Sequence, residues 1–119
     1  MESMGEVQDD PMVIVGMPGA SGKTQGPVRI VNSAHEAAQV QKGEIVISQY
    51  SSSVINLVLS KANGIVTDLG GVLCHAAICA REAELPCVVG CHTATSRLRN
   101  GDEVEVDGSK GIVRILKKH

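Results

Sequence analysis

The sequence has almost no aromatic residues: Tyr50 is the only one, and phenylalanine and tryptophan do not occur among its 119 residues. Its 11 lysine and arginine residues are balanced by 13 aspartate and glutamate residues, which gives a formal net charge of −2 and no basic stripe. Surfaces that bind nucleic acid usually combine clustered positive charge with aromatic side chains on which bases stack. We therefore expect no nucleic acid among the partners of this protein.

Long hydrophobic runs are also missing. No apolar stretch approaches the roughly 20 residues that a membrane-spanning helix requires, and the N-terminus lacks the apolar core of a secretory signal. The four cysteines are too few for the disulfide scaffold of a small secreted domain. The sequence therefore predicts a cytoplasmic protein with free thiols and no membrane contact.

Aliphatic residues supply the core instead. Valine, isoleucine, leucine and alanine dominate, as in parallel strands that are buried on both faces and covered by helices. The chain length suits one domain, and the opening residues MESMGEVQDD are polar. We predict a disordered tail over residues 1–11 and a single domain over residues 12–119.

Hydrophobic spacing and turn residues give the expected elements. Strands are predicted over residues 12–15, 27–31, 44–48, 65–67 and 87–89, followed by a hairpin of strands 103–106 and 112–116. Helices are predicted over residues 34–41, 54–62 and 74–83, with a helical turn or two within 93–99. The segment 16–23, rich in Gly, Pro and Ser, is predicted to be a loop. Alternation of strands and helices indicates an α/β fold with a parallel core sheet and a β-rich rim.

The candidate catalytic residue lies in the segment 64–81, GIVTDLGGVLCHAAICAR. A short strand is followed by Gly70 and Gly71, and then by a helix with His75 at its start. The N-terminus of a helix presents unpaired N–H groups and a positive partial charge, which together favour a bound anion. Because imidazole is a nucleophile, a histidine placed there can itself carry a phosphoryl group. We predict that His75 is transiently phosphorylated.

This stretch resembles the phosphohistidine signature of the phosphoenolpyruvate-utilising enzymes, which include phosphoenolpyruvate synthase, pyruvate phosphate dikinase, the phosphotransferase-system enzyme I and rifampin phosphotransferase. The pattern GG-x-x-x-H-A-A-x-x-A-R continues through Glu82 and the segment 85–90, LPCVVG. Weaker matches at residues 19–21, 26–28, 101–108 and 111–113 extend it over nearly the whole chain after residue 12.

The resemblance implies a swivelling β/β/α domain, with the phosphohistidine on an exposed rim. His75 would shuttle the phosphoryl group between a nucleotide or phosphoenolpyruvate site and an acceptor site on other domains. Its expected partners are an ATP-grasp domain and an acceptor-substrate domain, in the same chain or in separate subunits. The domain itself would bind no cofactor; Mg²⁺ and ATP or phosphoenolpyruvate would be held by the partners.

The phosphate would be bound by the turn and by the first amides of the helix, from Gly70, Gly71, Cys74 and Ala76. Arg81 matches the signature but follows His75 by nearly two helical turns, so a salt bridge or a rim contact with a partner is its structural alternative. Leu73 stands where the family usually has a hydroxyl residue, and leucine can neither be phosphorylated nor hydrogen-bond a phosphate.

Three other functions compete with the carrier function. The first is a non-catalytic swivelling lid or small subunit, which has no reason to keep His75. The second is a redox or zinc module built on Cys74, Cys87 and Cys91 with His92 or His75, and the spacing of these residues does not fit paired zinc knuckles. The third is nucleotide binding by residues 16–24, GMPGASGKT, where the first glycine of a P-loop would have to be at position 17, which is methionine.

Overall fold

The structure is a computed structural model that describes residues 11–50 and 53–118. Of the predicted tail over residues 1–11, only Pro11 lies within the described residues. In chain order the elements are β1 (Val13–Val15), β2 (Met17–Ala20), β3 (Lys23–Ile30), α2 (Ala34–Ala37), β4 (Ile45–Ser48), the 3-10 helix η1 (Ser53–Leu57), β5 (Gly64–Thr67), α3 (His75–Ala83), β6 (Cys87–Val89), α4 (Ala94–Arg97), β7 (Glu103–Asp107) and β8 (Ile112–Lys117).

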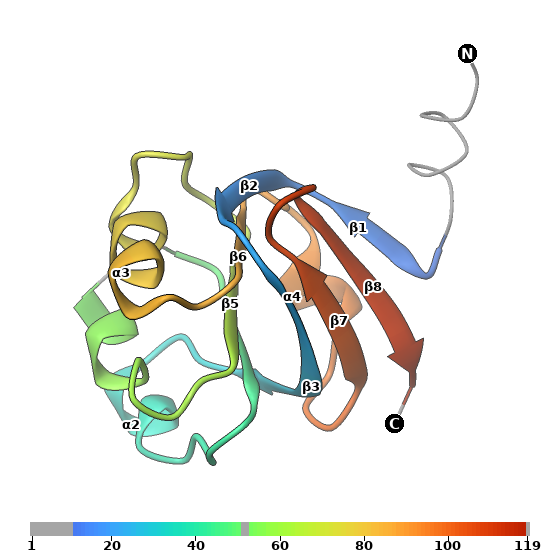
Figure 1. Cartoon of the computed structure of the whole chain (residues 1–119). Helices are drawn as coiled ribbons and strands as arrows, with labels where there is room; N and C mark the ends of the chain where they lie inside the picture. The colour runs from blue at the N-terminus through green and yellow to red at the C-terminus, as the bar shows by residue number, and fades with distance from the viewer. Residues whose placement is uncertain (1–10, 51–52, 119) are drawn as a thin grey trace.

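The strands form one connected sheet in the order β1-β8-β7-β3-β4-β5-β6-β2. The four central strands, β3 to β6, run parallel to one another. All the other pairings are antiparallel: β7 with β3, β8 with β7, β1 with β8, and β2 with β6. In Figure 1, the helices α2 and α3 lie on one side of the parallel strands and β7, β8 and β1 on the other. The predicted α/β fold with a parallel core and a β-rich rim is confirmed.

Strand β3 belongs to both parts of the sheet. Its first five residues, Lys23 to Pro27, pair with β7, and its last three, Val28 to Ile30, pair with β4. The strand thus leaves the antiparallel part where it enters the parallel part. The switch follows Pro27, whose nitrogen has no hydrogen to donate to a neighbouring strand.

Two hydrophobic cores lie on opposite faces of the parallel strands. Along β4, Ile45 and Ile47 face the core shared with β7, β8 and α4, whereas Val46 faces the core under α2, η1 and α3. Successive side chains of a strand point to opposite faces, so a strand that is covered on both sides must be apolar throughout. Full burial of each such side chain stabilises the fold by about 1.5–3 kcal/mol. These cores account for the aliphatic composition.

Four predicted boundaries are wrong. The strand predicted over residues 27–31 is β3, which already begins at Lys23. Half of the predicted loop 16–23 is the strand β2, which pairs with β6 at the edge of the sheet, where a proline is tolerated. The helix predicted over 34–41 ends at Ala37, although Ser33 caps it as expected by accepting a hydrogen bond from the Glu36 amide at 3.2 Å. The helix predicted over 54–62 is the single 3-10 helix η1.

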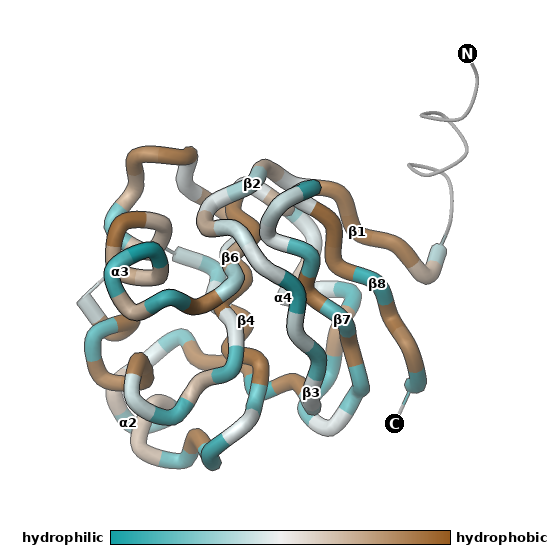
Figure 2. The backbone as a smooth tube through the Cα atoms, in the orientation of Figure 1, coloured by the Kyte–Doolittle hydropathy of each residue, from teal (hydrophilic) through white to brown (hydrophobic). Residues whose placement is uncertain are grey.

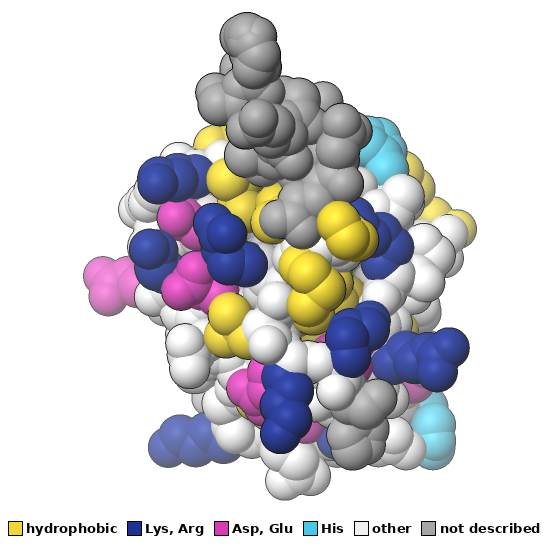
Figure 3. All heavy atoms as spheres, turned by 90° about the vertical axis from the view of Figure 1, so that its right-hand side faces the viewer, with side chains coloured by type: hydrophobic (Ala, Val, Ile, Leu, Met, Phe, Trp, Pro, Cys, Tyr) yellow, Lys and Arg dark blue, Asp and Glu magenta, His cyan; other side chains and the backbone are white. Residues whose placement is uncertain are grey.

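The face formed by β1 and β8 lies away from the helices. Figure 3 shows hydrophobic side chains in the middle of this face, with Lys and Arg side chains around them. Met12, Val15 and Leu116, on or beside these strands, are each more than a third exposed. None of the helices that the structure describes is long and apolar enough to span a bilayer.

Candidate active site

His75 stands at the first position of α3, at the end of a connection that leaves the parallel sheet after β5. The connection begins at Asp68, a buried carboxylate that accepts a 2.6 Å hydrogen bond from the Ala94 amide at the start of α4. It then turns at Gly70, whose φ of 114° is a conformation that side-chain-bearing residues rarely adopt. The sheet and Asp68 therefore fix where the connection starts, and Gly70 sets its direction.

Arg81 holds the other end of the connection. Its Nε donates to the carbonyl of Gly19 in β2 at 2.8 Å, and its Nη2 donates to the carbonyl of Val72. The side chain therefore reaches back along its own helix, and its guanidinium group joins β2 to the chain just before His75. Both acceptors are backbone carbonyls of this domain, so neither hydrogen bond is the predicted salt bridge. The contact with a partner stays a prediction.

Helix α3 presents its N-terminus without a side-chain cap. Cys74 occupies the N-cap position and makes no side-chain capping hydrogen bond, and none of the described residues of the first turn is acidic. The face of the helix against the sheet is made of Ala76, Ala77 and Ala80, which are fully buried. Small side chains let the helix pack closely on the sheet while its positive end stays near the surface.

The imidazole of His75 is exposed but has two side-chain neighbours. Its Nε2 lies 3.0 Å from Oδ1 of Asn56 in η1 and 3.4 Å from Sγ of Cys79, one turn further along α3. The same sulfur lies 3.8 Å from Nδ1 and 3.4 Å from Oδ1 of Asn56. His75, Asn56 and Cys79 therefore form one cluster that joins η1 to the start of α3.

The predicted phosphate-binding residues are only partly arranged as a cradle. The amide of Cys74 donates to the Gly71 carbonyl at 2.9 Å, so it closes the turn in this structure. Ala76 is fully buried. Gly70 is exposed and Gly71 half-buried, and a methyl group added at Gly71 would meet no other atom within 4 Å. The structure brings Gly70, Gly71 and Cys74 together immediately before His75.

The surface beside His75 is apolar. Leu73 is 80% exposed, and Val72 and Ile78 are each more than 40% exposed. Figure 2 shows the segment leading into α3 as a hydrophobic stretch at the edge of the molecule. Exposed apolar patches of this kind are typical of a surface that another protein or domain covers.

The four cysteines differ in their surroundings. Burial raises the pKa of the Cys87 and Cys91 thiols to about 12, which keeps them protonated. Burial and the nearby Glu82 also raise the pKa of Cys79. Throughout the described ranges, 11–50 and 53–118, no group of three or more His, Cys, Asp or Glu side chains gathers as a metal site.

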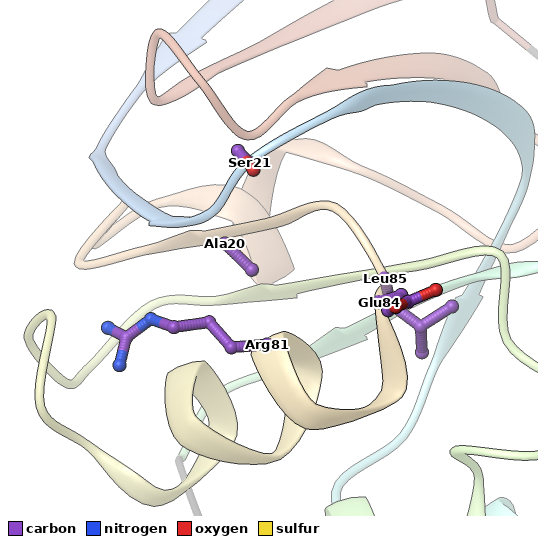
Figure 4. A pocket seen from close by; sticks show the side chains of 5 residues that line it. All are labelled: Ala20, Ser21, Arg81, Glu84 and Leu85. Carbon is purple, nitrogen blue, oxygen red and sulfur yellow. The ribbon is translucent and has the colours of Figure 1, made fainter.

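The P-loop alternative fails on geometry. A P-loop opens a helix, whereas Lys23 begins the strand β3. A pocket of about 260 Å³ does lie nearby, lined by Ala20, Ser21, Arg81, Glu84 and Leu85. Figure 4 shows the Arg81 guanidinium group pointing away from Glu84 and Leu85, along α3. The pocket lies near the C-terminal end of α3, and His75 is not among its lining residues.

Sequence analysis missed Asn56. Its contact with His75 joins residues 19 positions apart and depends on how η1 lies against α3. The one available signal was a polar residue within the apolar segment VINLVL, residues 54–59. Cys79 is half-buried and packs against the core under the helices, yet its sulfur also faces the His75 ring.

Comparison with known proteins gives relatives over most of the chain. It is 40% identical over 105 residues to an uncharacterized phosphotransferase of Bacillus subtilis (strain 168), covering 88% of this chain. It is 36% identical over 112 residues to the phosphoenolpyruvate synthase of Pyrococcus furiosus, covering 94% of this chain. The aligned part is only 13% and 14% of the length of these two relatives.

Solved structures agree on the fold. The solution structure of an Enzyme I protein matches with a TM-score of 0.58 and 34% identity, covering 66% of this chain and 33% of that one. Aconitase X of Thermococcus kodakaraensis matches with a TM-score of 0.63 but only 18% identity, over 88% of this chain and 98% of that one, and so supports the fold alone. The family described as "PEP-utilising enzyme, mobile domain" matches residues 40–111, which include η1, the glycine turn, His75 and Arg81. The chain belongs to this family of mobile domains of PEP-utilising enzymes.

Proposed function

We propose that this chain is a phosphoryl-carrier domain and that His75 is the residue that carries the phosphoryl group. The observation that supports this most strongly is the position of His75: an exposed imidazole at the first residue of α3, beside a helix end that has no side-chain cap. A phosphoryl group on this ring would carry its negative charge next to the positive end of the helix.

The reaction is an in-line displacement at phosphorus. A lone pair of one ring nitrogen forms the N–P bond while the bond between phosphorus and the donor oxygen breaks, and that electron pair leaves with the oxygen. The second transfer reverses these roles, since an acceptor oxygen attacks phosphorus and the ring nitrogen leaves. The donor is a nucleotide or phosphoenolpyruvate, and the acceptor is bound elsewhere.

Most of the charge stabilisation has to come from other domains. Arg81 directs its Nε and Nη2 hydrogens to two carbonyls of this domain. Phosphoryl transfer depends on positioning and on cations that neutralise the phosphate oxygens. An ATP-grasp domain with Mg²⁺, or a phosphoenolpyruvate site, would supply them, and an acceptor domain would receive the group. The two aligned relatives, of which this chain matches 13% and 14%, leave ample chain for such domains.

The apolar surface beside His75 supports docking of this kind. Val72, Leu73 and Ile78 carry no charge that would repel a phosphoryl donor, and they are exposed here. Contact with a partner domain would bury them and exclude water from the transferring group. The site would then be completed only while the two domains are in contact.

Intact-mass measurement tests the proposal. The protein is mixed with phosphoenolpyruvate and Mg²⁺, or with ATP, Mg²⁺ and the nucleotide-binding domain of its parent enzyme. A gain of one phosphoryl group that is labile in acid, stable in alkali and absent from His75→Ala would support the carrier function. Without a gain from any donor when all partner domains are present, the carrier proposal would be wrong and the lid function would take its place.

A further inference from the structure

The ring edge of His75 that carries both nitrogens lies against other side chains of the domain. Nε2 is 3.0 Å from Oδ1 of Asn56, which is the distance of an ordinary hydrogen bond. Sγ of Cys79 is 3.4 Å from Nε2 and 3.8 Å from Nδ1. No phosphoryl group fits between Nε2 and Oδ1 at this separation. In the observed ring position, Nε2 is therefore not available to accept a phosphoryl group.

The chemistry of the amide fixes where the ring proton is. The side-chain oxygen of an asparagine only accepts hydrogen bonds, so the nitrogen facing it must carry a hydrogen. The Cys79 thiol also donates to this oxygen, at 3.4 Å, which favours the orientation in which the amide oxygen rather than the amide nitrogen faces the cluster. A neutral His75 ring with its proton on Nε2 has its lone pair on Nδ1.

We propose that Asn56 is the positioning residue of His75: it holds the resting ring in the Nε2–H tautomer and keeps Nε2 from acting as a nucleophile until the ring turns away. The consequence of this positioning role for phosphoryl transfer rests on the proposed carrier function. Attack through Nε2 requires the Asn56 hydrogen bond to break, Nε2 to lose its proton and Nδ1 to take one from water. The Nε2 lone pair then bonds to phosphorus as the leaving group departs.

Nitrogen NMR tests the tautomer directly, with no phosphoryl donor present. Protein labelled with ¹⁵N-histidine is measured above the pH at which histidine titrates, as the wild type, Asn56→Leu and Asn56→Asp. In the wild type, His75 should show the shifts of the Nε2–H tautomer. Asn56→Leu removes the acceptor at nearly constant size, so its His75 shifts should move towards the tautomer mixture of a free side chain. Asn56→Asp keeps an acceptor oxygen and should keep the Nε2–H pattern.

A small phosphorylating reagent tests the consequence for reactivity. Phosphoramidate transfers its phosphoryl group to an imidazole nitrogen and releases ammonia, so it needs no partner domain. Loss of one neutral hydrogen bond changes the ratio of the two ring tautomers by roughly 2- to 10-fold. The rate of phosphorylation at Nε2 of His75, distinguished from phosphorylation at Nδ1 by NMR of the product, should therefore be higher in Asn56→Leu than in the wild type by roughly that factor, whereas Asn56→Asp should show no gain.

The chain offers a matched control. His35 and Gln39 form another pair of an imidazole and a side-chain amide, exposed on and just after α2, with 3.4 Å between His35 Nε2 and Gln39 Nε2. Gln39→Leu should leave the His75 shifts and rate unchanged. Unchanged His75 shifts in Asn56→Leu, or a rate of phosphorylation at Nε2 no higher than in the wild type, would overturn the positioning role. If the shifts respond as expected but no donor phosphorylates His75, the carrier function fails and the effect of Asn56 on the tautomer stands.

Discussion

Arg81 donates a hydrogen bond to the carbonyl of Val72, nine residues earlier in the chain, and so its own helix is tied to the segment that delivers His75. A second hydrogen bond, from Nε to the Gly19 carbonyl, ties the same guanidinium group to the edge strand β2. Arg81 thus helps to position His75 from nearly two helical turns away. It does so through these two backbone carbonyls and not through a hydrogen bond to the imidazole ring.

Replacing Arg81 with lysine should loosen this connection. An ammonium group cannot offer the planar pair of donors that reaches both carbonyls. We expect Arg81→Lys to lower the free energy of unfolding by about 1 kcal/mol, the size of one net hydrogen bond, and to slow phosphorylation of His75. Urea unfolding and intact-mass time courses measure the two effects. Arg99→Lys, on the exposed connection between α4 and β7, is the matched control and should change neither.

The two glycines before His75 should respond in opposite ways to alanine. Gly70 has a φ of 114°, so Gly70→Ala should lower the free energy of unfolding by about 1–3 kcal/mol. Gly71 is not among the residues with positive φ, and an added methyl group there meets open space. Gly71→Ala should therefore leave stability unchanged or raise it by up to about 1 kcal/mol. Equal losses in the two variants, measured by urea unfolding, would contradict this assignment of backbone strain.

Thiol labelling of the native protein should divide the cysteines into two pairs. Cys74 and Cys79 are half-buried, whereas Cys87 and Cys91 are buried. We expect two cysteines to react with an aromatic disulfide reagent in the folded state and two only after unfolding. Because burial and Glu82 raise the pKa of Cys79, it forms little thiolate and should react more slowly than Cys74. Cys74→Ser and Cys79→Ser should each remove one of the two early reactions; four equal rates would contradict the burial pattern.

Stability should fall in alkali because of the two buried thiols. In the unfolded chain these thiols ionise near pH 9, whereas in the folded domain burial holds the pKa of Cys87 and of Cys91 at about 12. Between these values the unfolded state binds fewer protons than the folded state, so a rise in pH favours unfolding. Each thiol should contribute a slope of up to about 1.4 kcal/mol per pH unit above pH 9.

Urea unfolding between pH 8 and 11 measures this slope. The double variant Cys87→Ala, Cys91→Ala should be less stable than the wild type at pH 8, because it loses buried sulfur atoms from both cores. Its stability should nevertheless fall less steeply with pH. The same slope in both proteins would mean that other groups cause the alkaline loss.

The sequence predicted those elements whose signal is local. The helix α3 and the hairpin of β7 and β8 were placed to within about a residue, because periodic apolar residues and the glycines beside them act over short distances. The strand β2 was missed because MPGA, residues 17–20, has the composition of a loop. It forms a strand only because β6 offers a free edge, against which the small Gly19 can pack next to Cys87.

The candidate site was predicted in the same uneven way. The position of His75 at the start of α3 followed from the glycines and the helix formers around it. The neighbours of His75 did not, because Asn56 reaches it across 19 residues and the Arg81 hydrogen bonds run to backbone carbonyls, which no side-chain pattern encodes. Contacts of this kind depend on how α3 packs on β2 and η1, and that packing is a property of the folded chain.

The crossing of β3 between the two parts of the sheet has a mechanical consequence. Since one continuous strand donates and accepts hydrogen bonds first with β7 and then with β4, a force applied to either part is transmitted to the other through backbone bonds. Neither part can slide or peel away without breaking the pairing of this strand. The two parts of the sheet must therefore move together, as one body.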